Sequence, residues 1–94
     1  MIRKQRAADN QTKVTFVLPD AGASISVVAD FNEWDPHVHP LKKRTNGTRS
    51  VQVTLPAGSE ARFRYLADGS FFDDPDADGF EPNGCGETHS LVLT

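Results

Sequence analysis

The densest group of side chains that could bind a metal ion lies in the last quarter of the sequence. Asp74, Asp76 and Asp78 alternate along the chain and are followed by Gly79, a D-x-D-x-D-G pattern that opens an EF-hand calcium loop. An EF-hand also needs a bidentate Glu at position twelve, where this chain has Cys85, and two flanking helices, which the sequence does not predict. We therefore expect a turn in which aspartate side chains accept hydrogen bonds from nearby backbone amides.

Histidines and paired carboxylates are the remaining candidates for chemistry. His37 and His39 are two residues apart, so on an extended segment they face the same side, but no thiol or carboxylate is placed convincingly beside them, and His89 is distant in sequence. The adjacent Asp73 and Asp74 would point to opposite faces of a strand and could not flank one bond. The chain also lacks the common nucleophile and phosphate-loop motifs. We expect neither a metal cofactor nor enzymatic activity.

The only tryptophan lies in an unusually polar segment. Trp34 stands in "DFNEWDP", where carboxylates and an amide surround it and Pro36 ends the segment. An indole in such a loop is hard to bury, and an exposed indole on a rigid scaffold offers a flat surface for stacking. The alternative is that Trp34 packs into the edge of a hydrophobic core. Phe31, three residues earlier, is expected in the core, where it would anchor the loop.

The segments that must position these residues read as short β-strands. Apolar and polar residues alternate, or apolar residues run together, in five stretches: 13–19, 24–29, 49–55, 61–68 and 89–94. Turn signals such as Asn46-Gly47 separate them about every ten residues, and no stretch has the 3.6-residue period of a helix. This pattern predicts a single all-β domain, either a sandwich or a barrel, over residues 12–94. Residues 1–11 are polar and aperiodic, and we expect a flexible N-terminal tail there.

Alternation also assigns faces within the strand over 61–68. Phe63 and Tyr65 point toward the core, and Arg64 points outward together with its neighbour Arg62. The same rule, continued past the Asp-Gly turn, places Phe72 on the core side.

Composition narrows the class of partner. The chain has 94 residues, 24% of them charged and 37% hydrophobic, with a formal net charge of −3. An acidic balance disfavours nucleic acid and anionic membranes as partners, because both require a basic surface. A single cysteine forms no intramolecular disulfide, and no apolar run suggests a signal peptide or a membrane span. We expect a cytoplasmic protein.

Three stretches, "VADFNEWDP", "LPAGSEARFRYLADGSFFDDPDADGFEPN" and "GETHSLVL", together resemble carbohydrate-binding module family 48. This family is the early-set, immunoglobulin-like antiparallel β-sandwich at the N-terminus of isoamylases and glycogen branching enzymes. The chain is similar also to the glycogen-binding domain of the AMP-activated protein kinase β subunit. The resemblance covers roughly residues 12–94, and it implies that fold.

The resemblance also implies a site for an α-1,4-linked glucan. On the matching positions of this chain, the loop tryptophan is Trp34, the basic residue before the Asp-Gly turn is Arg64, and the aromatic after it is Phe71. The polar residue at the start of the last strand is Ser90, with His89 adjacent. The glucan-binding members carry Lys, Trp and Asn where this chain has Arg64, Phe71 and Ser90.

The residues and the resemblance together predict a non-catalytic module that binds glycogen- or starch-type glucan, alone or beside a glycogen-metabolising enzyme. Aromatic rings would stack on the C–H faces of the sugar, and a guanidinium would contact its hydroxyl groups. A second hypothesis is a protein-interaction or regulatory module in which the same aromatics form a hot spot. A third is a structural domain whose tryptophan is buried.

Overall fold

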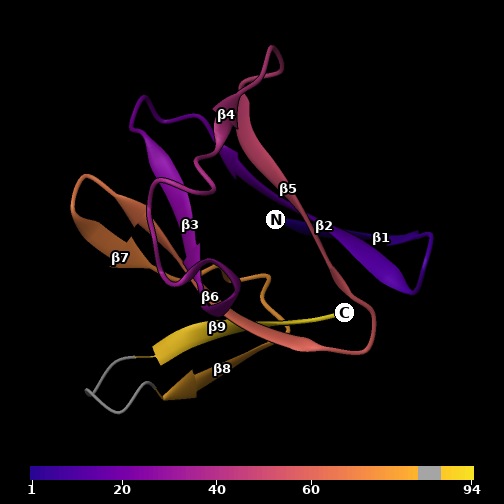
Figure 1. Ribbon diagram of the computed structural model, residues 1–94. Helices are drawn as coiled ribbons and strands as arrows, with labels where there is room; N and C mark the ends of the chain where they lie inside the picture. The colour runs from indigo at the N-terminus through magenta and orange to yellow at the C-terminus, as the bar shows by residue number, and fades with distance from the viewer. Residues whose placement is uncertain (83–87) are drawn as a thin grey trace.

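The computed structural model describes residues 1–82 and 88–94 and contains two antiparallel β-sheets packed face to face (Figure 1). The first sheet has the order β1-β2-β5-β4, with β1 at Ile2–Ala7, β2 at Gln11–Pro19, β5 at Thr48–Pro56 and β4 at Lys42–Lys43. The second has the order β3-β6-β9-β8, with β3 at Ile25–Ala29, β6 at Glu60–Ala67, β9 at Thr88–Leu93 and β8 at Gly79–Pro82; β7 (Ser70–Phe72) pairs with β6. The predicted all-β sandwich is confirmed, and the immunoglobulin-like early-set assignment stays a prediction.

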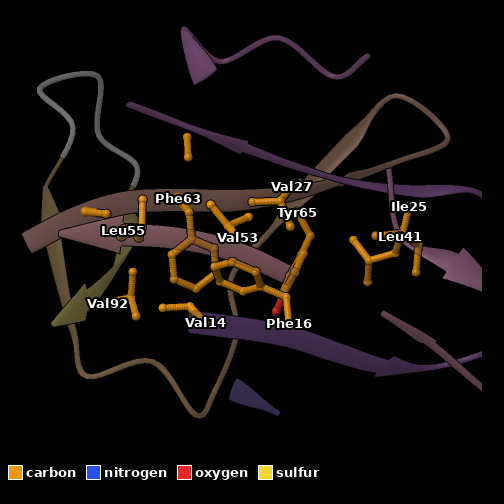
Figure 2. Close-up of a cluster of buried hydrophobic side chains, with 12 residues drawn as sticks. Val14, Phe16, Ile25, Val27, Leu41, Val53, Leu55, Phe63, Tyr65 and Val92 are labelled. Atoms are coloured by element: carbon orange, nitrogen blue, oxygen red, sulfur yellow. The ribbon is translucent and has the colours of Figure 1, made fainter. Parts of the chain in front are cut away.

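The core lies between the two sheets and is built from the alternating residues of the predicted strands. Phe16 of β2 meets Phe63 and Tyr65 of β6 at its centre, with the Phe16 and Phe63 ring centroids 4.9 Å apart (Figure 2). Aliphatic side chains surround these rings: Val14, Ile25, Val27, Leu41, Val53, Leu55 and Val92. The inward direction predicted for Phe63 and Tyr65 is confirmed, because both are completely buried.

The N-terminal segment is ordered, so the prediction of a flexible tail over residues 1–11 was wrong. Residues 2–7 form β1, which pairs with β2 from Ile2 opposite Phe16 to Ala7 opposite Gln11. Most of this edge strand is exposed, so its sequence carries no apolar alternation that would reveal it. Its backbone pairs with β2, and the packing of Ile2 against the core and the bond from Lys4 to Asp78 favour the observed register.

Two further elements complete the sheets. The predicted turn at Asn46-Gly47 joins β4 to β5, with Gly47 in a left-handed conformation at φ +80° and a bond from the Arg44 amide to the Thr48 carbonyl. The loop expected between Phe72 and Thr88 contains the short strand β8, which pairs with β9. This strand matters because it brings Glu81 opposite His89.

Cys85 lies among residues 83–87, outside the part of the chain that the structure describes. Within the described residues, no helix has the length and apolar character that crossing a membrane would require.

Candidate functional site

The loop that carries Trp34 is held by a buried asparagine. It begins with a 3₁₀ turn, η1 (Asp30–Asn32), which follows β3 and contacts β6 (Figure 1). The Asn32 side chain accepts a 2.9 Å hydrogen bond from the Ala29 amide and donates a 3.0 Å bond to the Val27 carbonyl. The Trp34 amide then donates a 2.8 Å bond to the Ala29 carbonyl. These bonds fold the loop back on the end of β3.

The backbone at the tryptophan adopts a costly conformation. Glu33 and Trp34 both have φ near +58°, in the left-handed region that residues with a side chain seldom occupy. The Asn32 bonds and the Trp34 amide bond hold this conformation in place. Trp34 is 41% exposed, so the hypothesis that it is buried in the core is wrong.

His89 lies against the indole of Trp34. Their ring centroids are 6.0 Å apart and the rings are inclined by 34°, which is a tilted stack. His89 sits on β9 opposite Glu81 of β8, and its Nε2 lies 3.8 Å from Glu81 Oε1. The imidazole is largely covered, with 13% of the side chain exposed. His89 therefore supports one side of the indole from the sheet below it.

Glu81 is itself held by two hydrogen bonds from an arginine of β6. Arg62 of β6 donates two hydrogen bonds to the Glu81 carboxylate, from Nε at 3.1 Å and from Nη2 at 3.2 Å. These bonds hold the pKa of the Glu81 carboxyl below its usual value and raise the pKa of Arg62. Glu81 was not predicted as a site residue because β8 carried no recognisable strand pattern.

Arg64 and Phe71 form a second unit on the outer face of the same sheet. The guanidinium carbon of Arg64 lies 5.4 Å from the centroid of the Phe71 ring, within cation–π range. Arg64 Nε also lies 3.4 Å from Asp73 Oδ1. Only 14% of the Arg64 side chain is exposed, whereas Phe71 is 53% exposed. The aromatic ring is thus the accessible partner, and the arginine lies mostly beneath it.

Ser90 does not belong to this outer face, and its prediction as a contact residue was wrong. It pairs with Phe63, whose side chain points into the core, and it is completely buried. Its hydroxyl donates to Asp73 Oδ1 at 3.0 Å and accepts from the Asp74 amide at 3.3 Å. Side chains alternate along a strand, so the adjacent His89 is the residue that faces outward.

Two other phenylalanines, Phe72 and Phe31, were expected in the core, and neither is fully buried. Phe72 points to the core side, opposite Tyr65, with ring centroids 5.2 Å apart. It lies at the end of the sandwich and keeps 36% of its surface exposed, so the prediction of a core residue was wrong. Phe31 is only partly buried, so it is not the core residue that was expected; it packs against the core from outside and makes an edge contact with His39.

The Asp-rich segment is a hydrogen-bonded turn, as we expected in preference to a calcium loop. Asp74 Oδ1 accepts a 2.8 Å bond from the Asp76 amide, and Asp74 Oδ2 accepts a bond from the Tyr65 hydroxyl. Asp78 instead accepts bonds from Lys4 and from the Leu93 amide. Within the described ranges, no three His, Cys, Asp or Glu side chains are grouped to hold a metal ion.

The histidine pair does not converge. His39 Nδ1 lies 2.9 Å from the Asn32 amide nitrogen, which turns it toward the Trp34 loop, whereas His37 is exposed. Burial lowers the pKa of His39. The role of His39 is therefore structural, because it helps to fix Asn32.

The positively charged side chains are distributed unequally between the two sheets. Eight of the ten Lys and Arg residues lie on the first sheet or its β4–β5 turn: Arg3, Lys4, Arg6, Lys13, Lys42, Lys43, Arg44 and Arg49. The remaining two are Arg62 and Arg64, both on β6 and both on the outer face beside Trp34, His89 and Phe71. We call these five side chains the outer aromatic face.

Comparison with known proteins supports the fold and goes no further. No family model and no curated protein matches the chain. Among solved structures, it is similar to a crystal structure of ferric enterobactin esterase from Salmonella typhimurium, with a TM-score of 0.76 and 11% sequence identity. The match covers 99% of this chain and 34% of the esterase, so this chain spans about one third of that protein. At this identity, the likeness concerns the β-sandwich alone.

Proposed function

We propose that this domain is a non-catalytic module that binds α-1,4-linked glucan on its outer aromatic face. The observation that carries the proposal is Trp34 itself: an indole with 41% of its surface exposed, fixed by a strained loop and backed by His89. A pyranose ring has apolar C–H faces, and a flat, immobile aromatic ring binds them at little entropic cost. The choice of an α-1,4-linked glucan as the ligand rests on the sequence resemblance to carbohydrate-binding module family 48.

Some residues of the outer aromatic face would contact the sugar, and others hold the contacting residues in position. Trp34 and Phe71 are the exposed rings on which sugar units stack, whereas the mostly covered Arg64 orients Phe71 and presents only part of its guanidinium to hydroxyl groups. His89 supports Trp34, and Ser90 stays inside the sheet. Such a shallow site binds weakly, with a free energy of roughly −4 to −8 kcal/mol, or millimolar to micromolar dissociation constants.

A titration with maltoheptaose followed by NMR tests the proposal. We expect the Trp34 indole signal to shift progressively up to ten-millimolar sugar, and we expect Trp34→Ala and Phe71→Ala to weaken binding at least about tenfold. Phe80→Ala is the matched control, because Phe80 is a comparably exposed aromatic on β8 whose register partner, Ser90, faces the core. An unmoved indole signal, or equal weakening by Phe80→Ala, contradicts the proposal.

The burial of two predicted sugar-contact residues favours a second candidate function, the binding of a protein partner on the same face. Arg64 is largely covered and Ser90 fully buried, so two of the polar residues expected to contact sugar hydroxyls are little accessible, whereas Trp34 and Phe71 are exposed. This composition suits a protein partner, for which exposed aromatics act as binding hot spots. In that case amylose beads retain neither the wild type nor the Trp34→Ala variant. Immobilised wild-type protein instead captures from lysate a specific protein that immobilised Trp34→Ala does not capture.

A further inference from the structure

A closed circuit of side chains links the tryptophan loop to three strands. Arg62 lies between Asp30, at 3.8 Å, and Glu81, to which it donates two hydrogen bonds. Glu81 approaches His89, and His89 stacks against Trp34. Asp30 begins the same loop that carries Trp34, so the circuit starts and ends on that loop.

His89 is the member of this circuit that can change charge close to neutral pH, since the others are carboxylates and a guanidinium. Its Nε2 is buried and, within the described residues, has no hydrogen-bond partner, although Glu81 Oε1 lies only 3.8 Å away. The charged group in direct proximity is Glu81 from β8; Arg62 of β6 is bonded to Glu81, Asp30 of η1 lies 3.8 Å from Arg62, and Arg64 follows Phe63, which pairs with Ser90. The nearest of these is the Glu81 carboxylate.

We propose that His89 is a positioning residue whose protonation fixes Trp34 in its stacked conformation. The imidazolium would donate from Nε2 to Glu81 and present a cation to the indole, and both interactions are weaker or absent when the ring is neutral. Trp34 is therefore more ordered at mildly acidic pH than at alkaline pH. The link to ligand affinity rests on the proposed function, because an ordered indole binds sugar at a lower entropic cost.

Trp34 is the only tryptophan, so fluorescence excited at a wavelength that Tyr65 does not absorb reports on this residue alone. We expect the emission of the free protein to change in one step between about pH 5 and pH 8, the range in which histidine titrates. His89→Gln should abolish the step. His37→Gln, which alters an exposed histidine of the same loop, should retain it. Glu81→Gln should move the step to lower pH, because it removes the negative partner of the imidazolium.

A matching titration with maltoheptaose at pH 5.5 and pH 8 should show about two- to fivefold tighter binding at the lower pH for the wild type, the ratio that corresponds to one weak cation–π contact. The His89→Gln form should show no such difference. An emission step that is unchanged in His89→Gln overturns the inference about His89. If the step behaves as expected but no sugar binds at either pH, the proposed function fails and the positioning role stands. Should His89→Gln fail to fold, the unchanged midpoint of Glu81→Gln is the result that overturns the inference.

Discussion

The hydroxyl of Tyr65 donates a 2.6 Å hydrogen bond to the carboxylate of Asp74, and both side chains are completely buried. Burial, and then the bond to Asp74, raises the pKa of Tyr65 far above its usual value. The bond joins the central strand β6 to the turn that precedes β8, so it fixes the segment from which Glu81 reaches His89. A core contact thus contributes to the geometry of the outer aromatic face.

Replacing Tyr65 with Phe should destabilise the domain by about 2 kcal/mol, because it leaves a buried carboxylate without its strongest neutral donor. The measurement is the free energy of unfolding in urea. The double variant Tyr65→Phe/Asp74→Asn is the control for the pairwise interaction, and it should lose less than the sum of the two single variants. Strict additivity would show that the bond contributes nothing.

Asn32→Ala should loosen the Trp34 loop and lower the free energy of unfolding by about 2 kcal/mol, since it removes bonds to the Ala29 amide and the Val27 carbonyl in a buried setting. Trp34 should also become more accessible to iodide and show lower fluorescence anisotropy. Gln52→Ala, an exposed change on β5, is the control and should alter neither quantity. Unchanged Trp34 anisotropy in Asn32→Ala would mean that the loop is held by its backbone alone.

Lys4 of β1 and Asp78 should make stability depend on acid pH. Burial raises the pKa of the Asp78 carboxyl, but the bonds from the Leu93 amide and from Lys4 outweigh it and leave that pKa below its unfolded value. A carboxyl of this kind stabilises the fold above its unfolded pKa, and the contribution is lost as the pH falls through the folded value. The advantage of the wild type over Asp78→Asn should be constant from pH 5 to pH 7 and should shrink below about pH 4.

Urea unfolding of both forms across this pH range provides the measurement. Lys4→Met is the companion variant, because it removes the cation and retains the carboxylate and the Leu93 bond. It should show a smaller acid-dependent change than the wild type. A stability difference between wild type and Asp78→Asn that persists undiminished at pH 2.5 would contradict the assignment.

The strands that form the core were predictable because each one carries its own alternation of apolar and polar residues. Alternation assigned Phe63 and Tyr65 to the interior correctly, and Asn46-Gly47 marked its turn through a backbone conformation that few other residue pairs tolerate. The strands β1 and β8 were missed for the converse reason. Each is an edge strand whose pairing depends on the backbone of a neighbour, and neither sequence shows the alternation of apolar and polar residues that marks a strand.

By itself, the sequence determined the all-β class, the inward residues of the central strands and the tryptophan loop as the segment of interest. Only the tertiary structure decided which residues accompany Trp34. The register of β9 turned Ser90 into the core and His89 toward the indole, and a shift of one residue would have exchanged them. Arg62 and Glu81 meet across 19 positions in sequence, and no local pattern encodes such a pairing, because it arises from strand neighbours that are chosen when the whole sheet assembles.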